Sequence, residues 1–261
     1  MRWNLSPDEF DHAWREAGLG RFPYPLEVQR TVDGPAAHAR ALSDWYEGYR
    51  SAELAVALGI LAKPSLRVEI FGVEGSAAVS DGLPAAVSDG RLAAEWDGRP
   101  AAVVRVLGCA SERTSVVVAQ RPGLTADTGG DLAMCLGGVE TLAQRIVDML
   151  PGAEPGGRRA MTAPAPEVRG GRRSSLLVPV RSATTAARIR ALLDRPRTGV
   201  GQVVVTSGLD RPGTPSSGAF SWIDVSGDGR YLVRTGSAVE IRPLSVAGFA
   251  AELRAELPAT F

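Results

Sequence analysis

The sequence has few of the residues that form disulfide frameworks and metal sites. Its 261 residues include two cysteines, Cys109 and Cys135, and two histidines, His12 and His38. Two cysteines are too few for a disulfide framework or a thiolate zinc site. Neither histidine has a partner at metal-ligand spacing. We therefore predict no metal and no cofactor, imidazoles at the surface, buried thiols, and a reduced, cytoplasmic location.

The sequence also lacks long apolar runs and an excess of charge of either sign. No run approaches the roughly 20 apolar residues that span a bilayer, so we predict no stable membrane insertion. Residues 1–9 are polar and do not resemble a secretory leader. The 29 basic and 29 acidic residues balance, which argues against nucleic acid as a partner. Lys63 is the only lysine, which is typical of a GC-rich genome such as that of an actinobacterium.

Known catalytic motifs are absent as well. The chain has no G-x-S-x-G elbow, no G-x-x-x-x-G-K-[ST] phosphate loop and no G-x-G-x-x-G fingerprint. Residues 224–230 imitate the first half of a calcium loop, but Thr235 stands where the bidentate carboxylate is required. We therefore predict a β-turn at this position. The lack of a catalytic constellation favours a binding protein and leaves open an enzyme whose residues meet only in the fold.

Helix and strand patterns alternate in the same order in both halves of the chain. Ser6 and Glu9 form a capping box ahead of a helix that Gly18 ends. The predicted helices cover residues 7–17, 35–62, 130–150, 184–193 and 246–257. The predicted strands cover residues 66–73, 91–96, 101–107, 115–119, 202–206, 220–225, 230–234 and 238–241.

This repeated order predicts an α+β fold built from two similar halves with quasi-two-fold symmetry. Ile60–Pro64 matches Leu192–Pro196 at an offset of 132 residues, which supports a duplicated unit. Residues 151–173 are poor in large apolar side chains, so we predict a flexible Gly/Pro/Arg-rich linker or loop. It separates an N-terminal half, residues 1–150, from a C-terminal half, residues 174–261, and the halves are expected to pack as one globular unit.

Several segments together resemble the EspG family. They are Leu5–Phe10 with Trp14, Gly18–Gly20 with Pro23–Leu26, Leu61–Pro64, and Phe220–Asp224 running into Asp228–Tyr231. Their order and spacing hold over nearly the whole chain. The resemblance implies a central antiparallel β-sheet flanked by helical bundles, with no nucleotide and no metal.

The resemblance also implies a function in actinobacterial protein export. Members of the family are cytosolic chaperones of type VII (ESX) secretion systems and not enzymes. They bind the exposed tip of helical PE/PPE-like proteins, keep these clients soluble and direct them to secretion. The partners implied here are secreted helical proteins of PE/PPE or WxG type, bound by a monomer or weak homodimer. The unusual composition of residues 151–173 leaves the particular client open.

A chaperone of this kind needs an apolar groove that covers an exposed hydrophobic helix tip. We place this groove on the second-half sheet beside the final helix, where alternate side chains also face the core. Trp, Tyr and Arg are prominent among its residues, and these types often dominate interface energetics. The candidate partner-binding residues are Val203, Val205, Trp222, Ile223, Tyr231, Val233 and Arg234.

Two other functions stay open from the sequence. An enzyme with an unrecognised active site on the sheet would show a deep pocket with convergent polar groups, whereas a chaperone would show a shallow apolar groove. A structural homo-oligomer would use the sheet edges and would not purify as a lone monomer.

Overall fold

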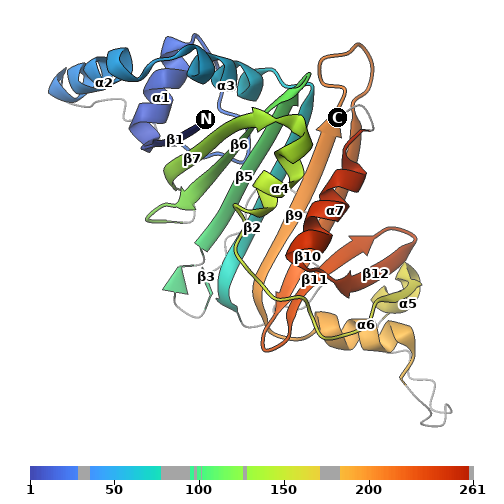
Figure 1. Cartoon of the computed structure of the whole chain (residues 1–261). Helices are drawn as coiled ribbons and strands as arrows, with labels where there is room; N and C mark the ends of the chain where they lie inside the picture. The colour runs from blue at the N-terminus through green and yellow to red at the C-terminus, as the bar shows by residue number, and fades with distance from the viewer. Residues whose placement is uncertain are drawn as a thin grey trace.

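One large antiparallel sheet organises the chain in its computed structural model (Figure 1). The structure describes residues 1–28, 36–77, 95–96, 99–100, 102–125, 128–170 and 183–258. Within these residues the sheet has ten strands. They are β1 (Arg2–Leu5), β2 (Leu66–Ala77), β5 (Ala102–Ser111), β6 (Thr114–Pro122), β7 (Gly129–Gly138), β8 (Met161–Pro164), β9 (Arg197–Ser207), β10 (Ser216–Val225), β11 (Gly229–Thr235) and β12 (Ala238–Pro243). The two-residue strands β3 (Glu95–Trp96) and β4 (Arg99–Pro100) pair separately.

Two meanders share this sheet. The strand order is β1-β7-β6-β5-β2-β9-β10-β11-β12-β8, so β2 and β9, the first strand of each meander, meet at the centre. These two strands pair in antiparallel register, with Leu66 opposite Ser207 and Gly72 opposite Gly201. The α+β class and the antiparallel sheet are therefore confirmed, while the two-fold relation between the halves stays a prediction.

Helices cover both faces of the sheet. The helices are α1 (Pro7–Glu16), α2 (Ala36–Tyr49), α3 (Ala52–Ala62), α4 (Leu142–Val147), α5 (Ala165–Arg169), α6 (Thr185–Leu193) and α7 (Val246–Glu256), with a short 3₁₀ turn at Val139–Thr141. Helices α4 and α7 pack together on one face, which we call the first face. On the second face, α1 and α3 cover the β5-β6-β7 side and α5 and α6 cover the β11-β12 side (Figure 1).

A tryptophan and two glycines pack together at the centre of the first face. Gly72, Gly201 and Trp222 lie in one row across β2, β9 and β10. A Cβ added at Gly201 would lie 2.0 Å from the Trp222 ring, and one added at Gly72 would lie 2.6 Å from the Val200 carbonyl. Trp222 also contacts Phe249 of α7, with ring centroids 5.8 Å apart. The absence of side chains at the two glycines therefore makes room for the indole beneath α7.

The predicted capping box and most predicted elements are confirmed. The Ser6 hydroxyl accepts a hydrogen bond from the Glu9 amide, and the Glu9 carboxylate accepts one from the Ser6 amide at 2.7 Å. The helical pattern over residues 35–62 corresponds to α2 and α3, and the second-half strands and helices lie close to their predicted positions. The β-turn predicted in place of a calcium loop joins β10 to β11, with Gly227 at φ +65°. Of the strand predicted at 91–96, residues 91–94 lie outside the described part of the chain.

The helix predicted over residues 130–150 is wrong in its first half, because residues 129–138 form strand β7. Leu132 and Leu136 have a spacing of four that fits a helix. Together with Met134 they also have a spacing of two, which fits a strand. The glycine pairs at both ends and the neighbouring β1 and β6 favour the strand. Only Leu142–Val147 forms the α4 helix, which places Cys135 in the sheet rather than in a helix.

The flexible linker predicted over 151–173 is wrong for residues 161–169, which form β8 and α5. Strand β8 pairs with β12, and buried Ala163 and Val168 join the cluster beneath α6. Backbone hydrogen bonds hold the preceding loop to β11. The Arg230 amide donates to the Glu154 carbonyl at 2.7 Å, and the Gly156 amide donates to the Arg230 carbonyl at 2.9 Å. The segment is ordered without large apolar side chains because backbone hydrogen bonds to β11 and β12 hold it in place. Residues 171–173 lie outside the described residues, and the boundary between the halves stays a prediction.

We expect Gly201→Ala to lower the free energy of unfolding by about 1–3 kcal/mol, because the new methyl group overlaps the Trp222 ring. Urea denaturation followed by tryptophan fluorescence measures this change. The matched control is Gly59→Ala in α3, where an added Cβ meets nothing within 4 Å. This control should leave stability unchanged or raise it by up to about 1 kcal/mol. Equal effects of the two substitutions would contradict the packing role of Gly201.

Candidate functional site

Six of the seven predicted partner-binding residues are buried, and they lie on opposite faces of the sheet. Val203, Val205 and Trp222 belong to the core beneath α4 and α7. Ile223, Tyr231 and Val233 belong to the core beneath α5 and α6. The structure therefore does not bring these six side chains together on one surface, and each is at most 2% exposed.

Arg234, the seventh predicted residue, is partly exposed and fastens α7 to the sheet. Its Nε donates to the Glu252 carboxylate at 2.8 Å, and one of its Nη nitrogens also pairs with Glu256. The guanidinium lies 5.4 Å from the centroid of the Phe220 ring. Arg242 pairs with the same Glu252 carboxylate. Through this network Arg234 links strand β11 to helix α7.

The hydroxyl of buried Tyr231 holds the loop that precedes β8. It accepts a hydrogen bond from the Arg158 amide at 2.9 Å and donates to Asp228 at 2.9 Å. The amide of Gly157 donates to Asp228 at 2.7 Å, and Arg195 pairs with the same carboxylate. The Gly157 hydrogen bond is the main cause that lowers the pKa of Asp228, and Tyr231 and Arg195 add to it.

An open stripe runs along the second face of the sheet, between the α1–α3 layer and the α5–α6 layer. It consists of side chains of the central strands that helices leave at least partly exposed. We call it the central stripe and define it as Glu69 and Phe71 of β2, Gln202 and Val204 of β9, and Ala219 and Ser221 of β10. These residues alternate with the buried Val203, Val205 and Trp222. The period-two alternation in the sequence groups these residues on one face of the sheet. It does not indicate whether helices cover that face.

The central stripe has a mixed apolar and charged surface. Burial raises the pKa of Glu69, and the Arg67 guanidinium at 3.7 Å opposes this shift. Buried Arg105 lies over the Phe71 ring at 5.8 Å from its centroid. Phe71 and Val200 pack against buried Val73 and Val103 and form a small apolar cluster at one end. The stripe can therefore offer a partner apolar contact beside the Glu69–Arg67 ion pair.

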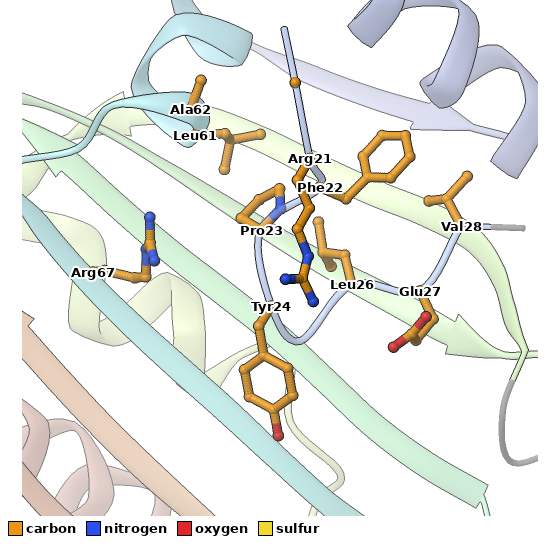
Figure 2. Close-up of a pocket in the computed structure, with 11 residues that line it drawn as sticks. Arg21, Phe22, Pro23, Tyr24, Leu26, Glu27, Val28, Leu61, Ala62 and Arg67 are labelled. Atoms are coloured by element: carbon orange, nitrogen blue, oxygen red, sulfur yellow. The ribbon is translucent and has the colours of Figure 1, made fainter. Parts of the chain in front are cut away.

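A pocket of about 860 Å³ lies beside the central stripe (Figure 2). It is enclosed by the segment that follows α1, the end of α3 and the start of β2. Its lining residues are Gly20, Arg21, Phe22, Pro23, Tyr24, Leu26, Glu27, Val28, Leu61, Ala62 and Arg67. The ring of Tyr24 lies 6.0 Å from that of Phe71, so the pocket and the stripe form one continuous surface.

Two polar side chains hold the pocket wall at residues 20–28 in place. The buried Gln120 amide accepts a hydrogen bond from the Glu27 backbone amide at 2.9 Å and donates to the Glu27 carbonyl at 2.8 Å. The Trp14 indole donates to the Gly20 carbonyl at 2.8 Å. Both ends of the segment are therefore anchored, and the exposed side chains between them are preorganised.

The two cysteines and the two histidines are buried in the fold or paired with other side chains. Both cysteines are buried as predicted, and burial raises the pKa of Cys109 to about 12, so it stays a thiol. His38 is exposed and pairs with Asp8 at 3.0 Å. The surface position predicted for His12 is wrong, because its ring packs against Tyr46 of α2 with centroids 5.6 Å apart.

The described residues include neither a metal-binding cluster nor a membrane-spanning helix. They contain no group of three or more His, Cys, Asp or Glu side chains that could hold a metal ion. None of their helices combines the length and apolar character needed to cross a membrane.

Comparison with known proteins identifies one family and one fold. A family model described as the EspG family matches residues 6–255. The chain is also similar to the structure of the Mycobacterium tuberculosis type VII secretion system chaperone EspG5 in complex with a PE25–PPE41 dimer. The TM-score is 0.63 at 16% identity, and the match covers 99% of this chain and 98% of that chain. This structural likeness shows a shared fold. No curated protein matches the chain.

We expect Asp228→Asn to destabilise the protein by about 1–2 kcal/mol at pH 7, because a charged acceptor of three hydrogen bonds is lost. Because the pKa of Asp228 is lowered in the fold, its carboxylate stabilises the protein at pH values above the ordinary pKa of 3.8. This stabilisation is lost as the pH falls below that value. The difference in unfolding free energy between wild type and variant should therefore narrow as the pH falls below about 4 in urea titrations. Asp210→Asn, in the exposed turn after β9, is the control and should change stability at neither pH. A gap that stays constant with pH would contradict this assignment.

Proposed function

The chain belongs to the EspG family, and we propose that it is a cytosolic chaperone of a type VII (ESX) secretion system. The observation that carries the proposal is the extent of the family match, which includes both meanders and the helices on both faces. A chaperone of this kind makes and breaks no covalent bond, so the proposed activity is protein binding.

The proposed clients are helical PE/PPE-like proteins, bound at an exposed apolar tip. One protein of known structure with this fold is described as a chaperone in complex with a PE25–PPE41 dimer. That description supports clients of the same class for this chain. The chaperone would keep such a client soluble by covering its apolar tip and would direct it to its secretion system.

The central stripe and the adjoining pocket are the surface that we propose for client binding. The stripe exposes Phe71 and Val204 on a rigid sheet, and the pocket exposes Tyr24 beside them. A preorganised surface loses little conformational entropy on binding. This assignment replaces the six buried residues, which lie beneath helices. Arg234 has a role in holding α7, so we do not assign it to the client.

Co-expression tests the proposed function directly. A PE/PPE-like pair encoded in the same genome should be insoluble when expressed alone and soluble when expressed with this chain. The two should then elute together in size-exclusion chromatography with a mass that corresponds to one copy of each chain. Failure of every such pair to become soluble, or a stable homo-oligomer of this chain alone, would contradict the proposal.

We expect Ala219→Glu to weaken client binding at least tenfold, because it places a carboxylate and added bulk beside Val204 in the central stripe. Isothermal titration with the purified client pair measures the change. Ala251→Glu is the matched control, since Ala251 is exposed on α7 against the other face of the sheet. Both variants should unfold at the wild-type urea concentration. Equal affinities of the two variants for the client would contradict the assignment of the stripe.

A further inference from the structure

The pocket beside the central stripe contains two guanidinium groups with unused hydrogen-bond donors. Arg21 is exposed, and within the described part of the chain it forms no ion pair or hydrogen bond. Figure 2 shows its guanidinium between Tyr24 and Leu26, with Arg67 across the pocket. The Nε of Arg67 is buried and has no acceptor among the described residues. A buried donor without an acceptor is costly.

The walls between these two arginines are apolar. Pro23, Leu26 and Leu61 are buried and line the pocket together with the ring of Tyr24. The volume of about 860 Å³ lies within the range of 300–1,000 Å³ that is usual for ligand pockets. It is large enough for one bulky side chain and its neighbours. The pocket therefore combines an apolar interior with cationic groups at its border.

The carboxylates near the pocket do not neutralise both arginines. Among the described residues that line the pocket, Glu27 is the one acid, and it lies beyond Leu26 from Tyr24 (Figure 2). Glu69 pairs with Arg67 at 3.7 Å, and burial raises the pKa of its carboxyl group. No carboxylate among the described residues pairs with Arg21. Because a guanidinium binds a carboxylate through two parallel hydrogen bonds, an anionic oxygen pair is the natural complement.

We propose that this pocket binds a carboxylate-bearing apolar segment of the client, in which Asp or Glu stands next to a large apolar residue. Arg21 and Arg67 bind the carboxylate, and the walls formed by Pro23, Leu26 and Leu61 bind the apolar neighbour. The identity of the ligand as part of a client rests on the proposed function. The chemistry of the pocket does not, and it can be measured without any client.

Two small probes of the same size, an acid and its neutral amide, test the chemistry. The acid 3-phenylpropionate should shift the Nε–Hε signals of Arg21 and Arg67 in ¹H–¹⁵N NMR spectra of the full chain. The neutral amide 3-phenylpropanamide should bind about tenfold more weakly, because it lacks the charge-assisted hydrogen bonds. Single Arg21→Gln and Arg67→Gln variants assign the two signals.

Each substitution in the pocket should abolish most of the preference for the acid. The matched control is Arg40→Gln, at an exposed position of α2 away from the pocket, and it should keep the wild-type preference. Equal binding of acid and amide, no shift of either signal with the acid, or a preference that survives both pocket substitutions would overturn the proposal.

A second measurement separates this proposal from the proposed function. With a co-expressed PE/PPE-like client, Arg21→Gln should weaken the complex about tenfold and reduce the salt dependence of its affinity, while Arg40→Gln should not. A client that is solubilised and bound equally by wild type and Arg21→Gln would overturn the carboxylate site and leave the chaperone function in place. An acid preference in the pocket without any solubilised client would overturn the chaperone function and support the pocket chemistry.

Discussion

The pairing of β2 with β9 is the interaction on which the rest of the structure depends. It joins two four-stranded meanders into one sheet and places Gly72 opposite Gly201. The two glycines leave space for the indole of Trp222, which packs against Phe249 and so seats α7 on the sheet. Larger side chains in this row would lift the indole, and α7 with it. Backbone pairing therefore joins the two halves as one sheet, and the close approach of ring and backbone fixes α7 on it.

The same pairing explains why the second face is open at its centre. The α1–α3 layer and the α5–α6 layer each cover the meander that follows them, and neither reaches across the first strands of both. Phe71, Val204 and Ala219 are consequently left on the surface. The segment at 20–28, held by Gln120 and Trp14, borders this surface with a pocket. The proposed client site is thus a consequence of where two helical layers end.

Local signals predicted much of the fold and little of the site. The capping box at Ser6 and Glu9 involves residues three apart, so the sequence contains all the information needed to place α1. In contrast, Leu132 and Leu136 fit both a helix and a strand, and the neighbouring strands β1 and β6 decide in favour of β7. Residues 161–169 looked like a linker because they carry few apolar groups, yet pairing with β12 needs only backbone donors and acceptors.

The sequence by itself determined the α+β class, the repeated order of elements, the resemblance to the EspG family and the alternation of side chains along β9 and β10. Along β9, this alternation puts Val203 and Val205 on one face and Gln202 and Val204 on the other. Only the tertiary structure decided which of these faces is covered, because the helices that cover them belong to segments far away in the chain. Alternation has a period of two residues and is local, whereas exposure depends on every element that packs against the sheet.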